Sequence, residues 1–138
     1  MIVVDASLAL KLALNEADSD QVRARWQEWT DVGEPIIAPP LFRAETASVL
    51  RGNVYRGVLT AAAGERAFAL LEGLAIETRE PLNLYREAWN LANRFNRPTV
   101  YDCCYLALAA ITNSELWTAD RRLANAVRSR LGWVHMVP

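Results

Sequence analysis

The stretch MIVVDASLALKLAL, residues 1–14, decides the fold. Its first five residues form a short, β-branched apolar run that ends in an acid, Asp5. The residues that follow at once, SLALKLAL, have helical character. A short strand that leads directly into a helix is the repeating unit of α/β proteins, so this opening predicts that fold class.

Strand-like and helix-like segments alternate along the rest of the chain. We predict strands at 35–38, 74–78, 115–118 and 133–137, and helices at 18–29, 41–57, 59–71, 82–95, 101–113 and 120–130. Thr60 is a plausible N-cap, and Gly57 and Gly132 are expected to end helices. Short strands between long helices predict a three-layer α/β/α sandwich with a central, mainly parallel sheet of four to five short strands.

Length and composition bound the class of protein. The chain has 138 residues, of which 52% are hydrophobic and 22% charged, so we expect residues 1–138 to form a single globular domain. The longest apolar run, residues 103–111, is far shorter than the roughly 18 residues of a membrane span. No basic region precedes the apolar N-terminus, which argues against a secretory signal. We therefore expect a soluble, cytoplasmic protein with no membrane contact.

Charge and metal-ligating residues narrow the function further. The formal net charge is −1, so any contact with nucleic acid must be local. Cys103 and Cys104 are adjacent, poorly placed to bridge each other, and are expected to be small core residues. The single histidine, His135, has no partner at metal-ligand spacing, which disfavours a zinc site.

Three aspartates are expected at one edge of the predicted sheet. Asp5 ends the first strand, Asp102 opens the buried helix at 101–113, and Asp120 lies between the fourth strand and the last helix. In parallel sheets, ligands bind at the carboxyl ends of the strands, where the chain turns into the next helix. The alternative for each aspartate taken alone is an N-cap, for which Asp is a preferred residue.

A fourth acid and two hydroxyls complete the candidate set. Glu45 lies inside a helix, between Leu41 and Val49 on a largely apolar stripe, where a cap cannot explain it. It is either a site residue or a boundary residue that extends its carboxylate to water. Ser7 and Thr118 are each two residues from an aspartate and could orient water or phosphate, or cap the adjacent helices.

Gathering carboxylates requires a cation. Two like charges about 4 Å apart repel by roughly 4 kcal/mol at an effective dielectric constant near 20. An all-oxygen site without His or Cys selects a hard ion, Mg²⁺ or Mn²⁺, which takes phosphate oxygens as further ligands. The pattern therefore predicts hydrolysis of a phosphate ester by a water molecule that the ion makes more acidic.

Four segments carry a resemblance to a known family: VVDAS at 3–7, AETASVL at 44–50, TVYDCCYLALA at 99–109 and LWTADRRL at 116–123. With these segments in this order, the chain resembles the PIN-domain ribonucleases, most closely the VapC-type toxins of toxin-antitoxin modules. The family's acidic and hydroxyl positions fall on Asp5, Glu45, Asp102, Asp120, Ser7 and Thr118.

The resemblance has implications beyond the residues themselves. It implies a PIN-like fold and endonucleolytic cleavage of RNA with Mg²⁺ or Mn²⁺ held by the four acids. It also implies a homodimer and inhibition by a cognate antitoxin protein. Arg121 and Arg122 follow Asp120 where some relatives carry further acids, so the number of bound ions stays open.

Four other kinds of protein share part of this pattern. A catalytically inactive PIN-like binding module would not need the complete acidic set, and a flap-nuclease-like relative would cut DNA by the same metal chemistry. A phospho-acceptor signalling domain needs a late lysine, but Lys11 is the only lysine. A phosphatase of the haloacid dehalogenase type needs a second aspartate two residues after the first, where this chain has Ser7.

Overall fold

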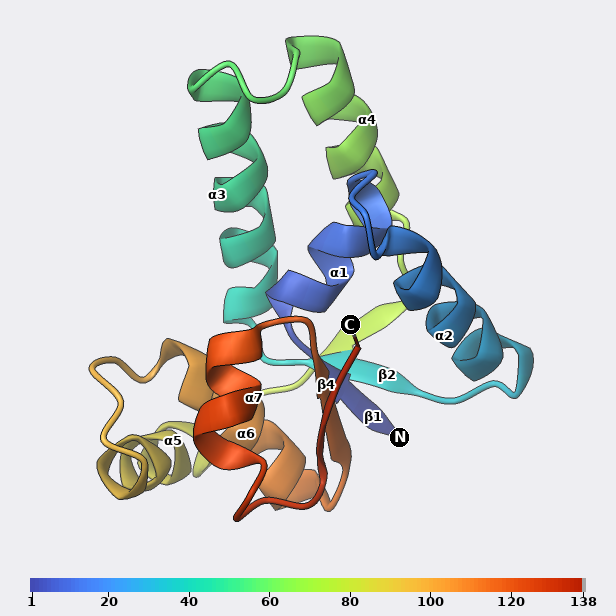
Figure 1. Cartoon of the computed structure of the whole chain (residues 1–138). Coiled ribbons are helices and arrows are strands. Elements are labelled where there is room, and N and C mark those ends of the chain that lie inside the picture. Colours follow the sequence, from blue (N-terminus) through green and yellow to red (C-terminus); the bar gives the residue numbers. More distant parts are fainter. Residues whose placement is uncertain (138) are drawn as a thin grey trace.

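The computed structural model describes residues 1–137 and has a central parallel sheet (Figure 1). The sheet has five strands in the order β3-β2-β1-β4-β5, and every neighbouring pair is parallel. The strands are β1 (Ile2–Val4), β2 (Ile36–Ala38), β3 (Ile76–Thr78), β4 (Glu115–Thr118) and β5 (Val134–Met136). The predicted mainly parallel sheet of short strands is confirmed.

Seven helices connect and cover these strands within residues 1–137. They are α1 (Ala6–Ala13), α2 (Ser19–Asp31), α3 (Leu41–Tyr55), α4 (Ala61–Glu72), α5 (Leu84–Arg94), α6 (Tyr101–Thr112) and α7 (Arg121–Val127). In Figure 1, α1 and α2 lie on one side of the sheet and α5 and α6 on the other. The predicted three-layer α/β/α class is therefore confirmed.

Helix α6 forms the centre of one layer. Its residues from Cys103 to Ala109 are all at most 1% exposed, because the helix packs against β1 and β4 on one side and α5 on the other. A helix that is buried all round must be apolar all round, as the sequence of this segment predicted. The helix ends at Asn113, which adopts the left-handed conformation (φ 52°) that asparagine tolerates.

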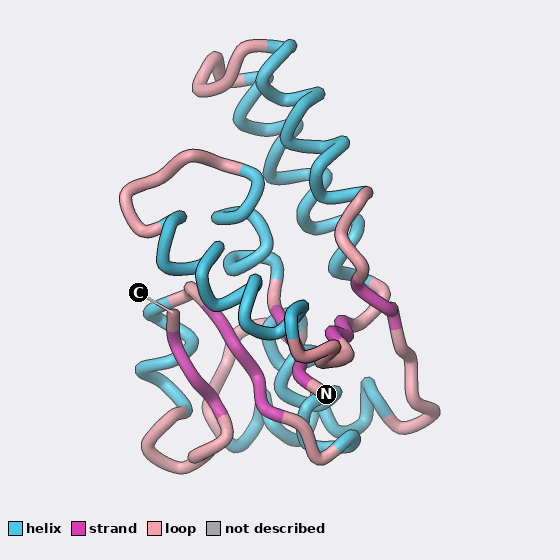
Figure 2. Tube along the Cα trace, turned by 90° about the vertical axis from the view of Figure 1, so that its right-hand side faces the viewer, coloured by secondary structure: helices cyan, strands magenta, loops and turns pink. Residues whose placement is uncertain are grey.

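Helices α3 and α4 form an antiparallel pair that extends away from the sheet, as Figures 1 and 2 both show. The predicted cap of α4 is confirmed, since Thr60 Oγ1 accepts a hydrogen bond of 3.1 Å from the backbone N–H of Ala63. The pair is close at Gly64 on α4, where an added Cβ atom would overlap Cγ2 of Val54 on α3. A glycine is therefore needed at this crossing.

The predicted boundaries fail most clearly at the C-terminal end of the chain. The last helix was expected over 120–130 but ends at Val127, and residues 128–130 form turns. The backbone N–H groups of Arg130 and Leu131 both bond to the carbonyl of Val127, which closes the helix early and buries Leu131 before β5.

Within residues 1–137, none of the helices is long and apolar enough to cross a membrane.

The α3–α4 crossing gives a test of the packing. We expect Gly64→Ala to destabilise the protein by roughly 1–3 kcal/mol in urea denaturation, because the new methyl group overpacks against Val54. Adding Val54→Ala should recover most of this loss. Gly132→Ala is the matched control, since a Cβ atom there meets nothing within 4 Å. A Gly64→Ala protein as stable as wild type would show that α4 does not seat closely on α3.

Candidate active site

The order of the strands creates a switch point between β1 and β4. From β1 the chain adds β2 and then β3 on one side, and later adds β4 and β5 on the other. In open α/β sheets such a reversal leaves a crevice at the carboxyl ends of the two strands. Asp5 follows β1 and Asp120 follows β4 by two residues, so both lie at this crevice.

Asp5 is held from several directions although it is only 5% exposed. Its Oδ1 accepts hydrogen bonds from Ser7 Oγ (2.7 Å) and from the backbone N–H of Leu8 (3.0 Å). Its Oδ2 accepts a short hydrogen bond from Thr118 Oγ1. Asp5 is thus confirmed as the N-cap of α1. Because it is also a buried carboxylate at the crevice, the cap does not exclude a role as a metal ligand, which stays a prediction.

Burial dominates the ionisation of Asp5. It raises the pKa of this carboxyl from 3.8 to about 6, although the hydrogen bonds from Thr118, Ser7 and Leu8 act in the opposite direction. The charge of Asp120 raises the pKa of Asp5 further, which means that the two carboxylates are near enough to repel each other.

Asp120 also caps a helix. Its Oδ1 accepts hydrogen bonds from the backbone N–H groups of Arg122 (2.8 Å) and Leu123 (3.2 Å) at the start of α7. Thr118 Oγ1 accepts a 2.9 Å hydrogen bond from the backbone N–H of Asp120 while donating to Asp5. The Thr118 hydroxyl therefore links the two aspartates, and the structure brings both predicted hydroxyl residues, Ser7 and Thr118, into contact with Asp5.

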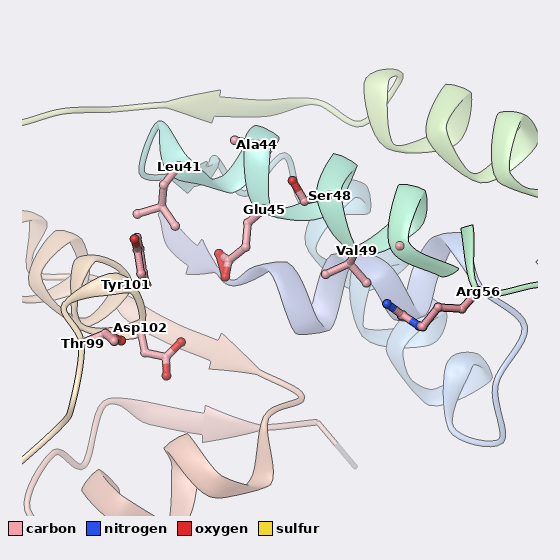
Figure 3. A pocket seen from close by; sticks show the side chains of 10 residues that line it. Leu41, Ala44, Glu45, Ser48, Val49, Arg56, Thr99, Tyr101 and Asp102 are labelled. Atoms are coloured by element: carbon pink, nitrogen blue, oxygen red, sulfur yellow. The ribbon is translucent and has the colours of Figure 1, made fainter. Parts of the chain in front are cut away.

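Glu45 is the acid that comes from the middle of a helix. It projects from α3 toward the start of α6 (Figure 3). The hydroxyl of Tyr105 on α6 donates a 2.6 Å hydrogen bond to its Oε1. Partial burial raises the pKa of Glu45, the bond from Tyr105 lowers it, and the charge of Asp102 raises it. Glu45 is therefore not a boundary residue that only reaches for water.

Tyr105 contacts a predicted site residue, Glu45, and was not itself predicted from the sequence. It is 1% exposed, and its burial and its bond to Glu45 raise the pKa of the phenol. A buried tyrosine hydroxyl needs a hydrogen-bond partner, and Tyr105 is the residue with a polar tip in the apolar run 103–111. A tyrosine hydroxyl within this apolar run, one helical turn after Asp102, is the feature of the sequence from which a polar contact near the acids could have been predicted.

Asp102 lies in the first turn of α6, but it is not the N-cap, a position that Val100 takes. Its Oδ2 is 3.4 Å from Nη2 of Arg97, a long contact for an ion pair. The Nε atom of Arg97 is buried and has no hydrogen-bond partner among residues 1–137. Arg97, which the sequence analysis also missed, therefore neutralises Asp102 only partly and leaves this carboxylate available to a stronger cation.

Glu45 and Asp102 face an open groove of about 670 Å³ between α3 and α6 (Figure 3). The groove is lined by Leu41, Ala44, Glu45, Ser48, Val49, Gly52, Arg56, Thr99, Tyr101 and Asp102. One wall is a face of α3 and the other is the start of α6 with the residues before it. The acids lie at one end of this groove.

The four predicted acids thus form two pairs. The charge of Asp120 raises the pKa of Asp5, and the charge of Asp102 raises the pKa of Glu45. Within residues 1–137, no three acidic, histidine or cysteine side chains converge closely enough to hold one ion together. The donors are nevertheless all carboxylate oxygens, and Arg97 is the cation that pairs with one of them in this part of the chain. This donor set fits a hard divalent cation and does not fit zinc.

Known protein families and relatives match nearly the whole length of this chain. A family model described as PIN domain matches residues 2–128. The chain is similar to a VapC ribonuclease of Mycobacterium bovis and to the ribonuclease VapC9 of Mycobacterium tuberculosis. Each relative is 36% identical over 125 residues, which are 91% of this chain and 90% of the relative.

Two solved structures resemble the fold. PAE2754 from Pyrobaculum aerophilum has a TM-score of 0.69 and 23% identity, over 99% of this chain and 83% of that one. VapC20 of Mycobacterium tuberculosis, described as a sarcin-ricin loop cleaving toxin, has a TM-score of 0.64 and 16% identity, over 92% of this chain and 95% of that one. At these identities the likeness supports the three-layer architecture alone.

The buried carboxyl of Asp5 makes the stability of the metal-free protein depend on pH. Because its pKa rises on folding from 3.8 to about 6, the folded state binds the proton more tightly, and this stabilisation is complete below pH 3.8 and lost as the pH rises through 6. The difference between the two pKa values corresponds to about 3 kcal/mol. In EDTA, we expect the unfolding free energy of Asp5→Asn, relative to wild type, to increase by about this amount between about pH 3.5 and 7.5.

The control for this measurement is Asp20→Asn, because the Asp20 side chain is 96% exposed. Its stability relative to wild type should hardly change over the same range of pH. A flat difference for Asp5→Asn as well would mean that Asp5 is not a desolvated carboxyl in the metal-free protein.

Proposed function

The chain belongs to the PIN-domain family and is a relative of its VapC ribonucleases, and from this premise we propose that it is a metal-dependent endoribonuclease, the toxin of a toxin-antitoxin pair. The proposed substrate is RNA, and the proposed cofactor is Mg²⁺, with Mn²⁺ as a substitute. The observation that carries the proposal is that two pairs of acids come from separate segments: Asp5 with Asp120 after β1 and β4, and Glu45 with Asp102 at the groove between α3 and α6.

The proposed metal ligands are Asp5, Glu45, Asp102 and Asp120, two pairs that would either draw together on one ion or hold one ion each. When bound, the ion would supply Lewis acidity and make a water molecule a better nucleophile toward the phosphodiester. The repulsion within the two acidic pairs supports this assignment, because a divalent cation relieves it.

The other residues of the site have positioning roles in this proposal. Ser7 and Thr118 hold both oxygens of Asp5, and Thr118 also holds the backbone N–H of Asp120. Tyr105 holds Glu45 toward the groove from the α6 side. The chain thereby orients its carboxylates before any ligand arrives, which limits the ordering that binding must impose.

Two partners follow from the same proposal. The resemblance to VapC-type toxins supports a cognate antitoxin protein, whose binding would inhibit cleavage. The proposed homodimer is supported by the family resemblance and by large exposed side chains on and beside α5, where Leu82, Tyr85 and Trp89 are 106%, 54% and 57% exposed.

Cleavage of matched oligonucleotides tests the proposed activity. We expect the protein to cut single-stranded RNA in Mg²⁺ or Mn²⁺, to leave the DNA of the same sequence intact, and to stop in EDTA. Asp102→Asn should lower the cleavage rate by roughly 10²- to 10³-fold with little loss of stability, because Asp102 caps no helix. Asp20→Asn should cleave like wild type, since this exposed residue lies on α2, outside the site.

The outcomes separate the alternatives. Cleavage of DNA but not RNA would indicate the flap-nuclease-like relative, and no cleavage of either would indicate an inactive binding module. Full activity of Asp102→Asn, or activity that survives exhaustive chelation, would remove the assignment of the site.

Tyr105 allows a test of the positioning of Glu45. Tyr105→Phe keeps the buried ring and removes only the donor to Glu45, so we expect Mg²⁺ affinity measured by calorimetry without RNA to fall by roughly 10- to 100-fold. Tyr55→Phe is the control, because Tyr55 is 80% exposed at the end of α3. If Tyr105→Phe lowers the melting temperature but leaves Mg²⁺ affinity unchanged, Tyr105 only packs the core.

A further inference from the structure

The groove extends well beyond the two acids that end it. Glu45, Ser48, Val49 and Gly52 line it from one face of α3, since they follow one another at helical spacing (Figure 3). Arg56, the C-cap of the helix, continues this face. This face carries an acid at the end nearest the sheet and a cation at the far end. The groove therefore has a charge at each end, of opposite sign.

The cation at the far end, Arg56, turns back along the groove toward the acids. Figure 3 shows its side chain pointing from the end of α3 into the groove. Its guanidinium group lies over Gly52, where an added Cβ atom would be 3.0 Å from Arg56 Nη1. The absence of a side chain at Gly52 leaves the space that this conformation uses.

The charge of Arg56 has no acidic partner among residues 1–137. Its Nη2 donates a 2.9 Å hydrogen bond to Oδ1 of Asn53, a neutral group that directs the guanidinium without cancelling its charge. Four other arginines, Arg23, Arg25, Arg79 and Arg97, form ion pairs with carboxylates, whereas several more, including Arg51 on α3, are unpaired like Arg56 within residues 1–137. What sets Arg56 apart is that it is the arginine that lines this groove. Arg56 thus presents an oriented, uncompensated fork of donors, which suits an oxyanion such as phosphate.

We propose that Arg56 is a phosphate-binding subsite for the RNA substrate, which lies along α3 from the acids to the end of the helix. This inference rests on the proposed ribonuclease function and adds the path of the substrate. Seven residues separate Glu45 from Gly52, or roughly 10 Å along the helix at about 1.5 Å per residue. A stacked strand covers that length in roughly three nucleotides at about 3.4 Å each.

The remaining lining of the groove suits a single strand. Tyr101, which is 62% exposed on the α6 wall, offers an aromatic ring on which a base can stack. Val49 adds apolar surface from α3 and is 39% exposed. Because the whole protein has a net charge of −1, it gains little from general attraction to RNA, and an oriented local cation is the contact that remains.

Binding of a short, fluorescein-labelled single-stranded RNA of mixed sequence tests the proposal by anisotropy. All proteins carry Asp102→Asn, so that binding is measured without cleavage. We expect Arg56→Gln to weaken RNA binding by roughly three- to tenfold and to reduce the slope of log binding constant against log salt concentration by about 0.7 in magnitude. Arg56→Lys should lose less RNA affinity than Arg56→Gln. Arg51→Gln is the matched control, because Arg51 is on the same helix but lines the other groove, between α3 and α4.

Gly52→Ala tests position instead of charge. The new methyl group moves the guanidinium of Arg56 without changing any charge, and it replaces a helix-interior glycine with a better helix former. We expect weaker RNA binding together with an unchanged or higher melting temperature. This combination cannot arise from unfolding.

The outcomes distinguish failure of the inference from failure of the proposed function. If wild type cleaves RNA but Arg56→Gln and Arg51→Gln bind it equally well, the proposed path along α3 is wrong, and the groove serves another occupant, such as an acidic peptide. If wild type neither cleaves nor binds RNA, the proposed function is wrong and the subsite falls with it.

Discussion

The burial of the Asp5 carboxylate where β1 and β4 end side by side is the constraint on which the rest of the site depends. Water is replaced there by two hydroxyl donors and one backbone N–H group, which hold the carboxylate but do not overcome its desolvation. Each donor fixes a neighbouring segment in turn: Thr118 fixes the end of β4, and Leu8 the first turn of α1. One unfavourable charge therefore organises the junction of three elements.

Much of this arrangement could be predicted from the sequence because it depends on local chemistry. The apolar runs that end in Asp5 and Thr118, and the uniformly apolar helix around Cys104, identify a covered parallel sheet and its functional edge. Helix ends were less accurate, as at Val127, because backbone bonds to a single carbonyl stop that helix without any glycine or proline.

The contacts that the sequence could not supply are long-range and depend on side-chain direction. Tyr105 meets Glu45 across 60 positions of sequence, and neither residue signals the other. The conformation of Arg56 depends on the empty space over Gly52, which composition does not record. The division of the acids into two pairs likewise depends on how the elements that carry them are arranged in space. The spacing of the acids along the sequence does not predict this division.

The double use of Asp5 and Asp120 as helix caps affects how genetic data on this protein are to be interpreted. In a genetic selection for inactive alleles, a substitution at either codon can be recovered because it lowers the activity of the protein or because it lowers the amount of folded protein. The frequency of such alleles therefore measures neither effect alone. Asp102 is not a helix cap. Inactive Asp102 variants that accumulate to normal protein levels would therefore report on the proposed role of this acid, separately from any effect on folding.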